Sequence, residues 1–197
     1  MILPQIRQQQ DIGHVRLGKG ENMEVKVYDD LLPEKVFNKI VQTVKTPTFG
    51  WHYNETVTYS AINRADMAEK DENFYFTHTL YDWGAPQCPH FNQIFNDIEG
   101  YLFEKADIDI KAIVRVKCNL YTRTEKIIQH DMHVDYEYDH IACLFSLNDC
   151  NGSTVFENGE KIESVANRLI VFNGNQKHAS TTCTNQKSRI NINFNLL

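Results

Sequence analysis

The seven residues "RININFN" at positions 189–195 alternate strictly between polar and apolar side chains. A period of two is typical of a β-strand whose two faces meet different surroundings. Ile190, Ile192 and Phe194 share one face, which we expect to pack on a hydrophobic core, while Arg189 and three asparagines share the other. That polar face could be exposed to solvent, or it could line the mouth of a barrel that holds an anionic ligand.

A second segment, "VRVKCNLY" at positions 114–121, has the same alternation. Its apolar face carries Val114, Val116, Cys118 and Leu120, and its polar face carries Arg115, Lys117, Asn119 and Tyr121. Because the pattern matches that of 189–195, the same two interpretations apply to both strands.

Short strand candidates follow one another closely after residue 109, separated by Asn, Gly and Asp residues. We expect strands at about 111–121, 131–136, 140–147, 153–156, 161–164, 168–172, 177–183 and 188–195. Many short strands in succession predict a β-sandwich or barrel. Two amphipathic segments, which follow Pro33 and Pro89, are expected to form helices that support one sheet. The predicted fold class is mainly β with flanking helices.

Length and charge restrict the class of protein. The 197 residues are enough for one domain with a substantial core. We expect an N-terminal extension at 1–22 and a single domain at 23–197, divided into an α/β support at 23–108 and a β core at 109–197. The net charge of −6 is more typical of a soluble cytoplasmic protein than of a nucleic-acid-binding protein, and no apolar run is long enough to span a membrane. The five cysteines form no C-x-x-C motif, so a thiolate zinc site is not expected.

The tripeptide "HVD" at 133–135 is the strongest sign of a metal site. On a strand, a histidine and an acid two positions apart point to the same side. Two imidazoles and one carboxylate on one side of Fe(II) leave the remaining positions open for a cosubstrate and O₂. His133 and Asp135 supply the first pair, and His178 is the one histidine downstream of the surrounding cluster. Eleven residues later, Arg189 could bind an anion.

Three other residues are considered near this site. His130 lies three positions before His133, so on a strand it would project to the opposite face. We expect it to be a loop residue or a residue that supports the ligands, and not to bind the metal. His140 precedes the next strand and could either border the substrate entrance or form a hydrogen bond within a turn. Trp83 lies in "YDWGAP", which could pack in the core or form a mobile lid over a substrate groove.

The C-terminal ninety residues resemble the double-stranded β-helix of the 2-oxoglutarate- and Fe(II)-dependent dioxygenases, a jelly-roll or cupin-like core. The likeness is greatest to the prolyl-4-hydroxylase-like branch. It rests on the segments "CNLYT", "HVD", "IACLFSLNDCNGSTVF", "VANRLIVFNGNQKHAS" and "SRININF". The resemblance implies that His133, Asp135 and His178 bind the iron. It also implies that Arg189, Tyr121 and Asn191 bind 2-oxoglutarate.

The same resemblance implies an O₂-dependent hydroxylase that uses Fe(II), 2-oxoglutarate and, for reactivation, ascorbate. Its expected substrate is a prolyl-type side chain in a protein or peptide. The sequence differs from the collagen-type enzymes at Arg189, where they have lysine, and at Asn191, where a hydroxyl residue is frequent.

Other functions stay open at this point. The same chemistry could act on a small molecule or on a nucleic acid, for which a local basic stretch is available: Lys111, Arg115, Lys117, Arg123 and Lys126. A cupin-like metalloprotein without oxygenase chemistry is a second class. A β-sandwich binding module with an accidental "HVD" is a third.

Overall fold

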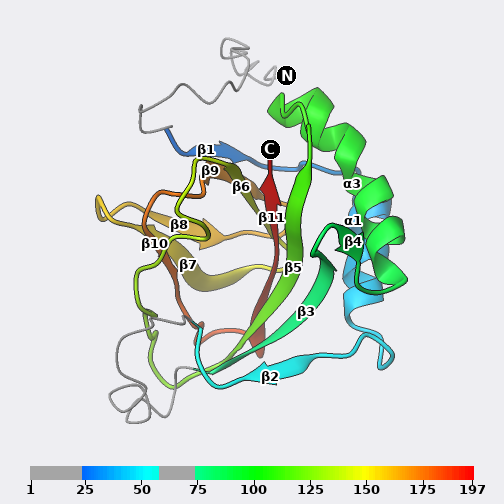
Figure 1. The fold of residues 1–197 in the computed structure, drawn as a ribbon. Helices are drawn as coiled ribbons and strands as arrows, with labels where there is room; N and C mark the ends of the chain where they lie inside the picture. Colours follow the sequence, from blue (N-terminus) through cyan, green and yellow to red (C-terminus); the bar gives the residue numbers. More distant parts are fainter. Residues whose placement is uncertain (1–23, 58–73) are drawn as a thin grey trace, which may run out of the picture.

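Two antiparallel sheets face each other, and two helices cover the outer face of the larger sheet (Figure 1). The structure is a computed structural model that describes residues 24–57 and 74–197. The predicted N-terminal extension at 1–22 therefore lies outside the described residues. None of the described helices is long and apolar enough to cross a membrane.

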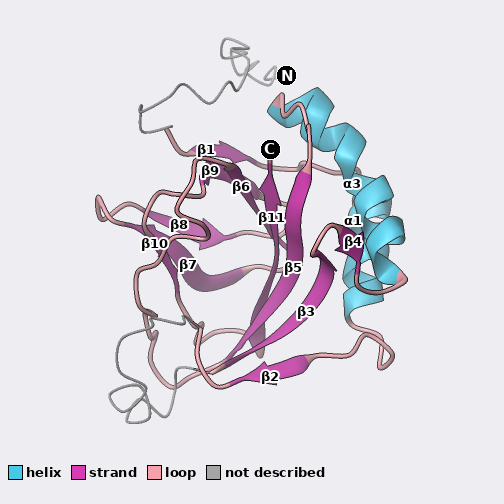
Figure 2. Cartoon of the chain, in the orientation of Figure 1, coloured by secondary structure: helices cyan, strands magenta, loops and turns pink. Residues whose placement is uncertain are grey.

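The larger sheet has eight strands and carries most of the chain (Figure 2). Its order is β1-β9-β6-β11-β5-β3-β2, with β4 paired to β3. The bounds are β1 Lys26–Tyr28, β2 His52–Asn54, β3 Tyr75–Asp82, β4 Ala85–Pro86, β5 Ile113–Thr122, β6 Ile141–Ser146, β9 Leu169–Asn173 and β11 Ser188–Leu196. The smaller sheet has the order β10-β7-β8, formed by β7 Cys150–Phe156, β8 Lys161–Ser164 and β10 His178–Ser180.

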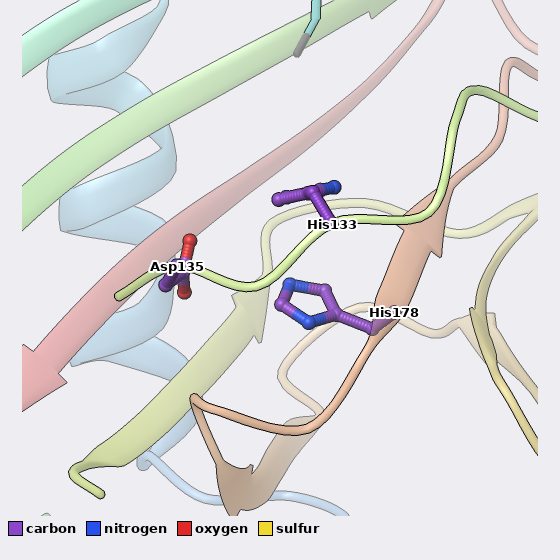
Figure 3. A group of neighbouring side chains, drawn as sticks. All are labelled: His133, Asp135 and His178. Atoms are coloured by element: carbon purple, nitrogen blue, oxygen red, sulfur yellow. The ribbon is translucent and has the colours of Figure 1, made fainter. Parts of the chain in front are cut away.

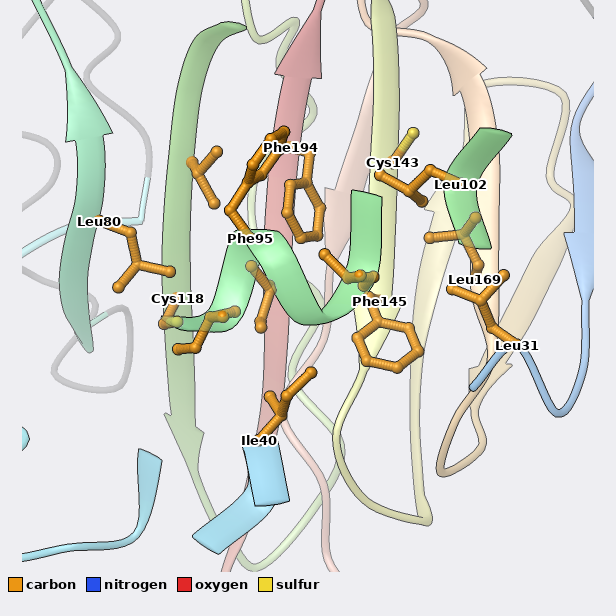
Figure 4. Packing of buried hydrophobic residues seen from close by; sticks show 14 of the residues in the cluster. Leu31, Ile40, Leu80, Phe95, Leu102, Cys118, Cys143, Phe145, Leu169 and Phe194 are labelled. Atoms are coloured by element: carbon orange, nitrogen blue, oxygen red, sulfur yellow. The ribbon is translucent and has the colours of Figure 1, made fainter. Parts of the chain in front are cut away.

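The main hydrophobic core lies between the larger sheet and the helices α1 (Glu34–Val44) and α3 (His90–Ala106) (Figure 4). The apolar faces of β5 and β11 supply residues such as Cys118 and Phe194, both with no exposed surface. Ile40 of α1 and Phe95 of α3 pack against this surface. The predicted apolar faces are therefore the ones that hold the helices in place.

The polar faces of β5 and β11 point into the space between the two sheets. Arg189, Asn191, Asn193 and Asn195 have exposed fractions of 1, 2, 6 and 0%. The interpretation that this face is exposed to solvent is therefore wrong. Opposite it, a small apolar cluster fills the rest of the interior: Ala142, Leu144, Phe156, Ile162, Ile170 and Phe172.

The register of β5 and β11 arranges these polar side chains in four opposing pairs. The partners are Arg189 with Tyr121, Asn191 with Asn119, Asn193 with Lys117, and Asn195 with Arg115. Partners in an antiparallel pair project to the same side of the sheet. The two strands therefore form one continuous polar wall, with a cation at each end.

The strand predicted at 131–136 is absent, which corrects the sequence-based assignment. Residues 129–133 are extended, but they pair with the β10 region only through two isolated bridges, Gln129 with Thr181 and His133 with His178. The bridges are four positions apart on one side and three on the other, so one extra residue interrupts the ladder. The other seven strands predicted after residue 109 are present as β5 to β11, and the fold class is confirmed.

Candidate metal centre and anion pocket

His133, Asp135 and His178 lie together at the opening between the two sheets. One ligand atom from each side chain lies within 4.8 Å of the others. Figure 3 shows His178 extending from β10 toward the segment that carries His133 and Asp135. Two backbone hydrogen bonds fix this arrangement, because the amide of each histidine donates to the carbonyl of the other at 2.9 Å. The isolated bridge between His133 and His178 thus brings the ligands together, as a regular strand was expected to do.

The two imidazoles present their Nε2 atoms for coordination. Nδ1 of His178 lies 2.9 Å from the carbonyl of Gln176, and Nδ1 of His133 lies 3.4 Å from that of Asp131. A ring that donates through Nδ1 keeps the lone pair of Nε2 for a metal. Burial, assisted by the nearby His178, lowers the pKa of His133 to about 4. His133 is therefore neutral at pH 7, as a metal ligand must be.

Three side chains hold the carboxylate of Asp135. Nη2 of Arg115 donates to it at 3.2 Å, Nδ2 of Asn193 at 3.1 Å, and Nδ2 of Asn195 at 2.8 Å. Burial would raise the pKa of Asp135, but the charges of His178 and Arg115 and the amide hydrogen bonds outweigh it and lower the pKa. The carboxylate is thus ionised and fixed in orientation. Two imidazoles and one carboxylate form a donor set that fits Fe(II).

Arg115, Asn193 and Asn195 were not identified as site residues from the sequence. The signal was present in the alternation of 114–121 and 189–195, which placed all three on the polar faces. It could not show which end of those faces would meet Asp135, because that depends on the path of the loop before β6. The basic stretch considered for nucleic acid is also divided, since Arg115 and Lys117 turn inward.

His140 supports the metal site indirectly, through Asn195. It is fully buried, and its Nε2 lies 3.1 Å from Nδ2 of Asn195, the same amide that binds Asp135. Its Nδ1 lies 2.8 Å from the carbonyl of Tyr138. The interpretation that His140 borders the substrate entrance is therefore wrong, and the hydrogen-bonded alternative describes it.

His130 does not point away from the site, in contrast to the prediction. It is 4% exposed, stacks on the ring of Tyr121 with 5.3 Å between centroids, and lies 2.8 Å from Oγ of Ser180. The extra residue between the two bridges reverses the expected alternation, so His130 and His133 both face inward. Burial, together with the charge of Arg189, lowers the pKa of His130 to about 4.

Arg189 is a buried cation at the inner end of the polar wall. Nη1 donates to the carbonyl of Ser153 at 2.9 Å, and Nη2 donates to Oγ1 of Thr154 at 2.9 Å. Its Nε is buried without a hydrogen-bond partner, and within the described residues no carboxylate pairs with it. A buried guanidinium is costly unless an anion pairs with it. This end of the cavity therefore suits the carboxylate of a ligand.

Tyr121 and Asn191 lie beside Arg189, as the sequence led us to expect. Cζ of Arg189 is 5.6 Å from the centroid of the Tyr121 ring, and Tyr121 stacks in turn on Tyr75. Asn191 accepts a hydrogen bond from Nδ2 of Asn119 at 2.9 Å. The metal trio, Arg189, Tyr121 and Asn191 all line one cavity of about 410 Å³, including the space at its mouth.

Trp83 does not line this cavity. It lies in the turn between β3 and β4, is 91% exposed and has a positive φ of 54°. The prediction that it contributes to the substrate pocket has no support in the contacts of the described residues. A turn of this kind places the residue at a hairpin tip, away from the interior of the sheet.

Solved structures with this architecture are numerous, although no protein-family model and no curated protein matches the sequence. A prolyl-4-hydroxylase from Pseudomonas putida has a TM-score of 0.54 at 11% identity, over 87% of this chain and 91% of that one. The viral collagen prolyl hydroxylase of Paramecium Bursaria Chlorella virus-1 has a TM-score of 0.55 at 13% identity, over 91 and 98%. A 2OG-Fe(II) oxygenase family protein from Burkholderia pseudomallei has a TM-score of 0.60 at 13% identity, over 87 and 84%.

The fold is that of the 2-oxoglutarate/Fe(II) oxygenases. Within this oxygenase fold, the likeness includes prolyl-4-hydroxylases and covers nearly the whole length of each chain. Identities of 11–13% establish the architecture alone. What the oxygenase fold does in this chain must be argued from its own residues.

Proposed function

We propose that this protein is an Fe(II)- and 2-oxoglutarate-dependent oxygenase that hydroxylates a side chain of a protein or peptide. The observation that carries the proposal is the shared cavity, which joins a His-Asp-His trio to a buried arginine without a carboxylate partner among the described residues. A metal site alone would fit many activities. An added anion site on the same polar wall is what a chelating dicarboxylate requires.

In this proposal, His133, Asp135 and His178 hold Fe(II), and Arg189 pairs with the distal carboxylate of 2-oxoglutarate. The hydroxyl of Tyr121 and the amide of Asn191 lie on the same wall and complete the cosubstrate site. Iron and 2-oxoglutarate, when bound, would supply the oxidising power that activates O₂. The protein positions the reacting C–H and excludes water from the cavity.

The substrate class is proposed from the neighbouring structures. One of them is a prolyl hydroxylase of Trichoplax adhaerens in complex with a peptide fragment of the oxygen degradation domain of hypoxia inducible factor. A prolyl-type side chain in a protein or peptide, presented in a cytoplasmic setting, is our proposal for this chain. The division of the basic stretch between interior and surface disfavours a nucleic-acid substrate.

Anaerobic titration tests the cofactor part of the proposal. Addition of Fe(II) and 2-oxoglutarate should produce the visible charge-transfer band of the chelate, and His133→Ala should abolish it. Arg189→Gln should weaken 2-oxoglutarate binding by about 2–5 kcal/mol, as expected for truncating a buried charge-assisted pair, while iron binding is retained. A folded wild-type protein without the band would overturn the proposal. Peptide hydroxylation is read separately as a +O mass shift.

A further inference from the structure

Lys117 is a cation of the polar wall that has no role in the metal site or in the anion site at Arg189 as described so far. It lines the same cavity, and its Nζ lies 3.4 Å from Oη of Tyr75 and 5.5 Å from the centroid of that ring. An ammonium has three N–H donors, and this contact is the hydrogen bond that Lys117 makes within the described residues. No described carboxylate lies within ion-pair distance of it. Lys117 is thus a charged group that faces the cavity with unused donors.

The register places Lys117 level with the metal trio. Its partner on β11 is Asn193, whose amide binds Asp135. Arg189, by contrast, is paired with Tyr121, four residues further along β5. At about 3.3 Å per residue, the two positions are about 13 Å apart along the strand. The cavity therefore has one cation at its inner end and a second beside the metal ligands.

Lys117 is not needed to neutralise or to position Asp135. Its carboxylate is already held by Arg115 and by the two asparagine amides. A lysine beside a divalent cation is unfavourable in itself, since the two positive charges repel. The arrangement becomes favourable when an anion lies between them. Under the proposed function, the carboxylate of an α-keto acid that chelates the metal is the anion that arrives there.

We propose that Lys117 pairs with the metal-bound carboxylate of the α-keto acid cosubstrate, while Arg189 pairs with the distal carboxylate. The inference rests on the proposed function and adds a second cation to its cosubstrate site. Electrostatics agree with this placement. Burial and the charge of Arg115 lower the pKa of Lys117 to about 8, and Asp135 opposes that shift. At pH 7 the amine is therefore protonated, and a bound carboxylate would favour that charged form further.

The test compares metal binding with keto-acid binding in the full chain by anaerobic titration calorimetry. Lys117→Met removes the charge and keeps the length of the side chain, and Lys117→Arg keeps the charge. Lys161→Met, at an exposed position on β8, makes the same change away from the cavity. The probes are Fe(II) alone, and then 2-oxoglutarate and pyruvate added to the Fe(II)-loaded protein. Pyruvate carries the chelating carboxylate and lacks the distal one.

The proposal predicts effects of opposite sign. Lys117→Met should bind Fe(II) at least as tightly as the wild type, because a repelling charge is gone. It should weaken 2-oxoglutarate and pyruvate by about the same factor, tenfold or more, which corresponds to about 1.4 kcal/mol. Lys117→Arg should stay within about threefold of the wild type for both acids, because it keeps the positive charge, and Lys161→Met should change nothing.

Three results would overturn the assignment, and they can be told apart. Unchanged affinity of Lys117→Met for both acids would mean that Lys117 meets another group, such as an anion on the substrate. Parallel loss of Fe(II) and acid binding would mean that the lysine only supports the fold. If the wild-type protein binds Fe(II) but neither acid, the proposed function itself fails, and this inference fails with it.

Discussion

Gly174 is the position where the structure makes its sharpest prediction. A Cβ at Gly174 would lie 1.9 Å from Nε2 of His140 and 2.3 Å from Cε1, both far below an ordinary contact. The ring would have to move by about 1.5 Å to restore a 3.4 Å contact, yet His140 has no exposed surface into which it could move. Gly174→Ala should therefore force His140 out of its place.

The expected cost follows from two contributions. Overpacking of a filled interior costs about 1–3 kcal/mol. Displacing the ring also breaks its hydrogen bonds with Asn195 and with the carbonyl of Tyr138, at about 1 kcal/mol each. We expect Gly174→Ala to lower the free energy of unfolding by about 3–5 kcal/mol. His140→Ala, which leaves a cavity, should cost a similar amount, about 2–4 kcal/mol.

A double-mutant cycle isolates the steric clash. Without the His140 ring, the methyl group introduced by Gly174→Ala has space, so the double variant should be no less stable than His140→Ala alone. The coupling energy should be about −3 to −5 kcal/mol, measured by urea unfolding of the metal-free protein at pH 7.5. Metal affinity should fall in both single variants and stay low in the double variant, since Asn195 lacks its partner. Additive losses of stability would refute the reasoning.

Three further predictions concern the polar wall and its surroundings. Gly152→Ala should destabilise the protein and weaken 2-oxoglutarate binding, because its Cβ would lie 2.7 Å from the Thr182 carbonyl and 2.9 Å from Cδ of Arg189. Gly100→Ala in α3, where a Cβ meets nothing within 4 Å, should instead stabilise the protein by about 0.5–1 kcal/mol, and urea unfolding measures both variants. His130 should make folding depend on pH: its folded pKa is about 4, whereas an unfolded histidine titrates near 6.5, so stability is lost as pH falls between these values. At pH 5 the loss should be about 2 kcal/mol relative to pH 7.5, and His130→Gln should remove this part of the pH dependence in urea titrations.

The parts of the site that follow from local alternation could be predicted from the sequence. The period of two in 189–195 placed Arg189 and Asn191 on one face, and the structure shows that face in the interior. The spacing of "HVD" brought His133 and Asp135 together, although the segment is not a regular strand. Both predictions depend on short-range geometry, which the residues themselves determine.

The roles of His130, His140 and Trp83 were harder to predict, because they depend on contacts between distant segments. One extra residue between two bridges turned His130 inward. Asn195, 55 residues away in the chain, is what makes His140 a support for Asp135. Trp83 was placed near the substrate without any spacing that required it. Alternation predicts on which face of a strand a residue lies, but it does not predict which distant segment will contact that residue.

The nine residues of β11 determine both the packing of the helices and the lining of the cavity. Even positions pack against the helices, and odd positions build the wall that reaches from Arg189 to Asn195. A single inserted residue would exchange the two faces, moving the asparagines into the helix interface and the isoleucines into the cavity. Such an insertion would disrupt both the hydrophobic core and the cavity lining. β11 can therefore accept substitutions one position at a time, but it cannot accept an insertion or a deletion.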